Sequence, residues 1–213
     1  ETLTGEIMQA AIHGTSIVHE GARLGKDVSI GPYSVIGPDV RIGDGTSVGS
    51  SVLIEGHTEI GRGNRIFHGA AIGSEPQDLK YSGGKTFTRI GDGNTIREYV
   101  TINSATGEGD ATVVGSKCLL MAYVHIAHDC VISDNVILAN AVNLAGHVAV
   151  HDYAIVGGIV PVHQFVRIGA HSFIGGGSRI PKDIPPFVKV AGNPPRVCGL
   201  NSVGLKRRGF SDE

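Results

Sequence analysis

Aliphatic residues recur at every sixth position along most of the chain. Of the 29 positions divisible by six between residues 12 and 180, 26 are Ile, Leu or Val. A helical period of 3.6 residues does not produce this spacing. A Gly commonly follows the aliphatic residue, and a small or β-branched residue commonly lies two positions before it. Each six-residue unit therefore predicts one short strand followed by a corner.

Three such units make a triangular coil of eighteen residues, and stacked coils would hydrogen-bond as parallel strands about 4.8 Å apart. The hexapeptide pattern resembles that of the left-handed β-helix family, an exception to the usual right-handed crossover. The handedness follows from that resemblance, since the spacing does not determine it. We predict an all-β fold: a left-handed parallel β-helix over residues 1–183 with a short non-repetitive C-terminal tail over 184–213.

Three positions interrupt the series: Asp78, Gly84 and Glu108. Burying an unpaired carboxylate costs several kcal/mol or more, so the chain must leave the coil at these places. We predict loops near 74–88 and 103–112. The tail is expected to begin a helical extension. A solenoid of this kind has a flat face to cover, which favours trimerisation.

Composition narrows the function classes. A core must come from Ile, Val and Leu, because aromatic residues make up only 5% of the chain and Trp is absent. The net charge of −2 gives no basis for binding nucleic acid. Three Cys without CxxC spacing indicate neither a disulfide framework nor a thiolate zinc site. No apolar stretch predicts membrane insertion. We expect a cytoplasmic protein, or one inside an organelle if an upstream transit peptide was removed.

Histidines gather in one part of the repeat. Stacking by eighteen residues places His128 under Gly146 and then Gln164, and Asp129 under His147, with His163 alongside. One polar cleft at an outer edge should result. Two other interpretations exist: solvent-facing corners that accept any polar residue, and a zinc site like that of the γ-class carbonic anhydrases, which use the same fold. The non-ligand groups beside the histidines, Gly146 and Gln164, argue against zinc.

Several motifs resemble those of the UDP-N-acetylglucosamine 3-O-acyltransferase family, which performs the first step of lipid A synthesis. The similarity extends over nearly the whole chain from Ile12. The motifs are His125-Ile126-Ala127-His128-Asp129-Cys130, Leu144-Ala145-Gly146-His147-Val148, Val162-His163-Gln164-Phe165, Gln77-Asp78-Leu79-Lys80-Tyr81 and Gly204-Leu205-Lys206-Arg207-Arg208-Gly209-Phe210.

The resemblance implies acyl transfer, typically of a 3-hydroxyacyl chain, from an acyl carrier protein thioester to the sugar 3-hydroxyl, without a cofactor or metal. His128 would be the general base, because imidazole titrates near neutral pH. Asp129 would orient His128, and this pairing requires a corner because adjacent strand residues point to opposite faces. Gly146 would let a backbone N–H approach the oxyanion.

The same resemblance implies the binding residues and a homotrimer with active sites between subunits. Gly176, in a run of three glycines, would bound the acyl groove. Two departures, at Val203 and Pro194, leave the uridine contacts and the chain length open. The implied sugar and pantetheine contacts are His125, His147, His163 and Gln164, with Gln77, Asp78 and Lys80 on the first loop, and the implied nucleotide contacts are Asn201, Arg207 and Arg208.

Three alternatives remain at this stage. The nearest is another hexapeptide acyltransferase, either an N-acyltransferase or an enzyme that uses acetyl-CoA. A zinc hydratase and a purely structural solenoid belong to different classes. The first-loop motif and the tail motif favour the O-acyltransferase over the other hexapeptide acyltransferases. The column of His128, Gly146 and Gln164 argues against a purely structural solenoid, and metal analysis with chelation would test the zinc hydratase.

Overall fold

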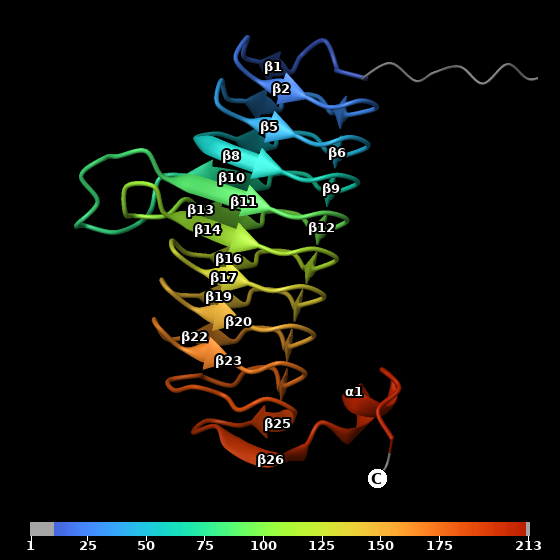
Figure 1. Ribbon diagram of the computed structural model, residues 1–213, viewed down its shortest axis with the longest axis vertical. Coiled ribbons are helices and arrows are strands. Elements are labelled where there is room, and N and C mark those ends of the chain that lie inside the picture. The colour runs from blue at the N-terminus through green and yellow to red at the C-terminus, as the bar shows by residue number, and fades with distance from the viewer. Residues whose placement is uncertain (1–10, 212–213) are drawn as a thin grey trace, which may run out of the picture.

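The computed structural model describes residues 11–211, which form a stack of triangular coils (Figure 1). Three parallel sheets make the faces of the stack. Sheet 1 contains β1 (Ile17–Val18), β4 (Val35–Ile36), β7 (Leu53–Ile54), β10 (Ala71–Ser74), β13 (Thr101–Asn103), β16 (His125–Ile126), β19 (Asn143–Leu144) and β22 (Pro161–Val162).

Sheets 2 and 3 are built in the same way. Sheet 2 contains β2 (Arg23–Leu24), β5 (Arg41–Ile42), β8 (His57–Ile60), β11 (Phe87–Ile90), β14 (Ala111–Val114), β17 (Val131–Ile132), β20 (Ala149–Val150) and β23 (Arg167–Ile168). Sheet 3 contains β3 (Ser29–Ile30), β6 (Ser47–Val48), β9 (Arg65–Ile66), β12 (Thr95–Ile96), β15 (Leu119–Leu120), β18 (Ile137–Leu138), β21 (Ile155–Val156), β24 (Phe173–Ile174), β25 (Val188–Ala191) and β26 (Arg196–Leu200).

The coil is left-handed, as the resemblance to the left-handed β-helix family implies. In Figure 1 the strands of sheet 2 face the viewer and run from left to right while the chain descends. Neighbouring coils pair in parallel at the expected spacing: Ile36 pairs with Ile54, eighteen residues further on. We name the three corners by the sheets they join, in chain direction: edge 1/2, edge 2/3 and edge 3/1.

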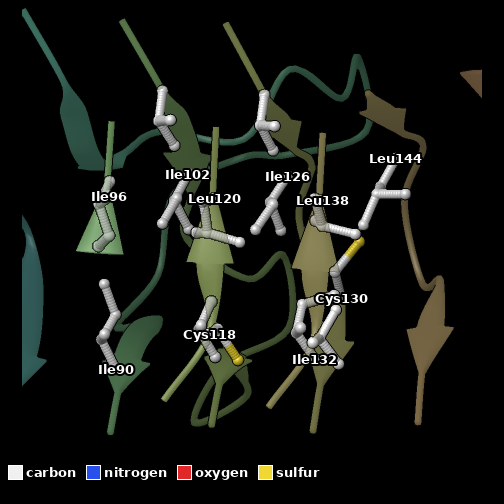
Figure 2. Packing of buried hydrophobic residues seen from close by; sticks show 14 of the residues in the cluster. Ile90, Ile96, Ile102, Cys118, Leu120, Ile126, Cys130, Ile132, Leu138 and Leu144 are labelled. Carbon is white, nitrogen blue, oxygen red and sulfur yellow. The ribbon is translucent and has the colours of Figure 1, made fainter. Parts of the chain in front are cut away.

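The core is the aliphatic ladder. Ile96, Ile102, Ile126 and Leu144 are fully buried, and Figure 2 shows such side chains stacked along the inside of the coils. Burying one Ile or Leu side chain stabilises the fold by about 1.5–3 kcal/mol. The residues two positions before the ladder, such as Val100 and Val124, are buried as well. Because these residues fill the interior of each coil, functional side chains must lie on the corners, on the loops or on the outward side of the strands.

A polar ladder also runs inside the core, on the sheet 3 side, at repeat positions that commonly hold a small or β-branched residue. Asn64 donates from Nδ2 to the Gly91 carbonyl (2.9 Å) and accepts from the Asn94 N–H (2.8 Å). Asn94 repeats the arrangement one coil later, with the Gly115 carbonyl (2.9 Å) and the Cys118 N–H (2.7 Å). Both asparagines are fully buried, and these bonds satisfy their polar atoms.

The corners hold their residues in the left-handed backbone region. Asp129, His147 and Phe165, which follow one another at edge 1/2, have φ of +60°, +61° and +65°. In a regular strand, adjacent side chains point to opposite faces. At such a sharp turn they do not have to, so two adjacent side chains can meet. The corner that the His128–Asp129 pairing requires is therefore present.

Two loops leave the coil, at 75–86 and 104–110, within the ranges where the sequence predicts them. Figure 1 shows both projecting from the same side of the stack. The strand register is kept across each loop, since Ile60 pairs with Ile90 and Ile90 with Val114. The loops therefore add residues to an edge without disturbing the core.

The parallel ladder ends near Ile180. That residue and Ile184 make only isolated bridges to the preceding coil, in a region containing Pro181, Pro185 and Pro186. β25 still pairs in parallel with β24, but β26 turns back and pairs antiparallel to β25. A short helix, α1 (Ser202–Lys206), follows. Within residues 11–211 no helix has the length and apolar character to cross a membrane.

The asparagine ladder gives a test of stability. Replacing Asn94 with Ala leaves the Gly115 carbonyl and the Cys118 N–H unpaired in the interior, which should lower the free energy of unfolding by about 2–4 kcal/mol. Asn143→Ala, on the exposed side of β19, is the control and should change it by less than about 0.5 kcal/mol. Denaturant unfolding followed by circular dichroism would measure both. Equal effects would show that the ladder contributes nothing special.

Candidate functional site

A compact polar group lies at edge 1/2, where the corners after β16 and β19 stack. The His128 Nδ1–H donates to Asp129 Oδ2 at 2.8 Å. His147 lies edge-on to the His128 ring, with ring centres 5.3 Å apart, and its Nε2 is 3.6 Å from Asp129 Oδ2. Phe165 stacks on the other face of His147 at 4.6 Å. The structure thus brings together the residues that the eighteen-residue spacing predicts to share an edge.

Asp129 is held by a residue from the second loop. Thr106 donates from Oγ1 to Asp129 Oδ2 (2.7 Å) and from its backbone N–H to Oδ1 (3.2 Å). The Asp129 N–H donates to Thr112 Oγ1 at 2.8 Å. Burial alone would raise the pKa of the Asp129 carboxyl, but the hydrogen bonds from Thr106 and His128 outweigh it and hold the pKa below its usual range. Asp129 is therefore an anion at neutral pH.

Gly146 lies directly over the His128 ring. A Cβ on Gly146 would be 2.7 Å from His128 Nε2, so only glycine leaves the ring in place. Within residues 11–211 no group accepts a hydrogen bond from the Gly146 N–H. At edge 2/3, the N–H at the same position of the repeat donates to a side chain of the next coil. For example, the Ser116 N–H donates to Asp134 Oδ1 at 2.7 Å. The Gly146 N–H is therefore an open donor on the residue that lies over the His128 ring.

The other predicted cleft residues lie on the same coil as His128 or on the coil after that of His147. His125, on β16, has its Nδ1 2.7 Å from Thr101 Oγ1. Burial, and to a smaller extent His128, lowers the pKa of His125, which favours its neutral form. His163 and Gln164 lie one coil further on and are exposed, and His163 Nδ1 is 3.1 Å from the Gln164 carbonyl.

The predicted first-loop residues do not meet the His128 group within one chain. Gln77 and Lys80 are exposed, and Leu79 between them is fully exposed. Asp78 Oδ1 accepts from the Lys80 N–H at 2.9 Å, which shapes the turn. Within the described part of the chain, none of these residues makes a hydrogen bond or ion pair with His125, His128 or Asp129.

The predicted tail residues lie at sheet 3 and edge 2/3, away from His128. Asn201 caps α1 by accepting from the Gly204 N–H (3.3 Å) and donates to the His171 carbonyl (2.9 Å). Arg208 lies 4.7 Å over the Tyr153 ring, and Arg207 lines a cavity of about 220 Å³ beside Phe173. Gly176 is exposed at edge 3/1, where a Cβ would be 3.1 Å from the Gly158 carbonyl oxygen. One chain therefore carries its predicted residues at four separate places: the His128 group, the first loop, the tail and Gly176.

His128, Asp129 and His147 could also hold a metal ion, because one ligand atom from each lies within 4.8 Å of the others. The hydrogen bonds favour a proton-transfer group instead. His128 Nδ1 carries a proton that Asp129 accepts, and both Asp129 oxygens already receive donors from Thr106. A metal would have to displace these protons.

The sequence interpretation missed Thr106, Thr112, Thr101 and Phe165. Phe165 lies eighteen residues after His147 and could have been found by extending the eighteen-residue spacing. Thr101 lies 24 residues before His125, because the second loop adds six residues between them, and Thr112 lies 17 residues before Asp129, so the eighteen-residue spacing does not find these two. Thr106 lies in the second loop, where the spacing gives no information. Only the presence of the loop itself pointed to it.

Two family models match the chain. Residues 183–213 match the second domain of UDP-N-acetylglucosamine O-acyltransferases, and residues 21–56 and 111–146 match the bacterial transferase hexapeptide repeat. A Herminiimonas arsenicoxydans protein described as an acyl-[acyl-carrier-protein]–UDP-N-acetylglucosamine O-acyltransferase is 57% identical over 203 residues, covering 95% of this chain and 78% of the relative. A Synechocystis protein with the same description is 58% identical over 156 residues. That match covers 73% of this chain and 56% of the relative's length.

Solved structures agree in shape. The UDP-N-acetylglucosamine acyltransferase of Francisella novicida superposes with a TM-score of 0.92 at 45% identity, covering 94% of this chain and 74% of that one. The Arabidopsis UDP-N-acetylglucosamine acyltransferase gives 0.83 at 42% identity, covering 94% and 78%. The similarity therefore includes the tail as well as the coils.

Proposed function

The chain belongs to the UDP-N-acetylglucosamine O-acyltransferase family, and from this premise we propose that it transfers an acyl chain from acyl carrier protein to the 3-hydroxyl of UDP-N-acetylglucosamine. This is the first step of lipid A synthesis, and the acyl chain is typically a 3-hydroxyacyl group. The observation that carries the proposal is the His128–Asp129 pair with the open Gly146 N–H beside it. The residues supply a base, its orienting anion and an oxyanion donor.

The chemistry follows from these positions. His128 Nε2 takes the proton of the sugar hydroxyl while its oxygen attacks the thioester carbonyl. The negative charge that develops on the carbonyl oxygen is stabilised by the Gly146 N–H. When the intermediate collapses, the C–S bond breaks and the imidazolium returns the proton to the phosphopantetheine sulfur. Asp129, 10% exposed, stabilises the imidazolium in between.

The remaining residues would bind the substrates. His125, His147, His163 and Gln164 line the edge around His128 and would contact the sugar and pantetheine. The neutral form of His125 suits a contact with an uncharged hydroxyl or amide. No separate cofactor or metal is needed for the proposed steps. We assign the other contacts to Gln77, Asp78 and Lys80 for the sugar, to Asn201, Arg207 and Arg208 for the nucleotide, and to Gly176 for the end of the acyl chain.

A second copy of the chain would complete the site. The loop and tail residues do not reach His128 within one chain, so a substrate that contacts all of them must lie between chains. Sheet 1 carries an outward apolar stripe, Ile17, Val35, Leu53 and Ala71, on consecutive coils, and Ile17 is 56% exposed. We propose a trimer that buries this stripe around its three-fold axis.

Removing the base should abolish transfer. His128→Ala should lower kcat by roughly 10²–10⁴-fold, and Gly146→Ala by roughly 10²-fold or more, because its methyl group displaces the His128 ring. His19→Ala, an exposed histidine near the N-terminal end, should change nothing. The assay follows acyl transfer from loaded acyl carrier protein to UDP-N-acetylglucosamine. Full activity of His128→Ala would refute the mechanism, and loss of wild-type activity on chelation would favour the zinc interpretation.

Chain-length preference should depend on Gly176. Gly176→Met fills space at edge 3/1 and should shift the preferred acyl chain to a shorter one, by roughly two to four carbons, since each CH₂ buried contributes about 0.8 kcal/mol. Gly176→Ala is the graded control and should shift the preference less. Competition among acyl carrier proteins loaded with different chains would measure it. An unchanged preference in the Met variant would remove Gly176 from the acyl groove.

Mixed assemblies would test the shared site. His128→Ala and Lys80→Ala chains should each be nearly inactive, yet co-assembled in equal amounts they should recover roughly a quarter of the wild-type activity. In a trimer with sites between subunits, a quarter of the sites then receive both intact residues by chance. If both residues act within one chain, the mixture stays as inactive as its components. Sedimentation analysis would confirm that the variants still assemble.

A further inference from the structure

The second loop reaches back to the reactive pair through one residue. Thr106 is the only residue of the 104–110 loop with a hydrogen bond to Asp129 in the described structure, and it binds both carboxylate oxygens. Asp129 Oδ2 receives the Thr106 hydroxyl at 2.7 Å and the His128 Nδ1–H at 2.8 Å. Two donors on one oxygen, with a third on the other, leave the carboxylate a single orientation.

The same loop is also tied to the first loop. The Lys85 N–H donates to Glu108 Oε2 (2.7 Å), and the Gly109 N–H donates to the Lys85 carbonyl (2.9 Å). Thr86 Oγ1 donates to Ser104 Oγ (3.2 Å), so the start of the second loop is held as well. The second loop therefore lies between the segment that carries Asp78 and Lys80 and the pair that carries the base.

We propose that Thr106 is a positioning residue for the transfer reaction, and that the 104–110 loop exists to hold it against Asp129. Thr106 acts through Asp129, which orients His128, and does not itself touch the reacting atoms. This inference rests on the proposed function of His128. The proposal also gives a reason for the interruption of the repeat at Glu108. A regular coil would have no residue in the position of Thr106 that could bind both carboxylate oxygens of Asp129.

The groups facing Asp129 set the expected pH dependence. They are His128, His147 with its Nε2 3.6 Å away, and the uncharged Thr106 and Thr112. Removing the Thr106 hydroxyl deletes one donor that stabilises the ionised carboxylate, so the pKa of Asp129 should rise. As the pH is lowered, Asp129 then becomes protonated at a higher pH than in the wild type. Asp129 supports His128 over a narrower pH range, so the acidic limb of the activity profile should move to higher pH.

Three variants test the proposal. Thr106→Val keeps the shape and the backbone N–H but removes the hydroxyl, and it should lower kcat roughly ten- to a hundredfold while leaving KM for the sugar nucleotide nearly unchanged. Thr106→Ser restores the hydroxyl and should restore most of the activity. Thr95→Val, on β12 in sheet 3, is the matched control and should behave like the wild type. Circular dichroism would confirm that all three are folded.

A measurement without substrate separates this inference from the proposed function. Titration of ¹³C-labelled aspartate carboxyls by NMR, with Asp129→Asn to assign the signal, should show a higher midpoint for Asp129 in Thr106→Val than in the wild type. An unchanged midpoint overturns the positioning role whatever the transfer assay gives. A lower kcat that Thr106→Ser fails to restore, with the pH profile unmoved, also overturns it. An inactive wild type with a shifted midpoint refutes only the assigned reaction.

Discussion

Hydrogen bonding between successive coils is the constraint on which the rest of the structure depends. Each coil must pair in register with the next, so its interior is filled by the ladder residue and the small or β-branched residue two positions before it, and many of its corners turn in the left-handed region. This fixes the vertical spacing of edge residues at about the 4.8 Å strand separation. Groups far apart in sequence then lie within contact distance: His147 against Phe165 and Gly146 over His128.

Much of this follows from the sequence because periodicity encodes it. The phase of the aliphatic ladder assigns each edge residue to a column, and the ladder resumes in phase after both interruptions. The sequence alone therefore places His128, Gly146 and Asp129 together. The charge of Asp78 and Glu108 marked the loops for an equally simple reason, the cost of burying a carboxylate.

The features that the sequence does not predict are of two kinds. Some lie outside the six-residue repeat, and others are polar residues at interior positions of the repeat. The position of Thr106 depends on how the second loop folds, and no spacing rule describes that. Asn64 and Asn94 occupy interior positions where polar residues are unfavourable unless each polar atom finds a partner, and the partners are carbonyls and amides of other coils. The tail motif predicts nucleotide contacts for Asn201 and Arg208, yet within one chain these side chains cap a helix and cover a tyrosine ring.

The way the ladder stops has a consequence for how copies of the molecule behave in concentrated solution. A stack of identical parallel rungs exposes unpaired backbone donors and acceptors at its last rung, and a second stack could add there to begin a fibre. Here β26 reverses direction across sheet 3, and the proline-rich segment after Ile180 has fewer N–H groups to offer sheets 1 and 2. The reversed strand and the missing donors work against head-to-tail growth at this end of the ladder.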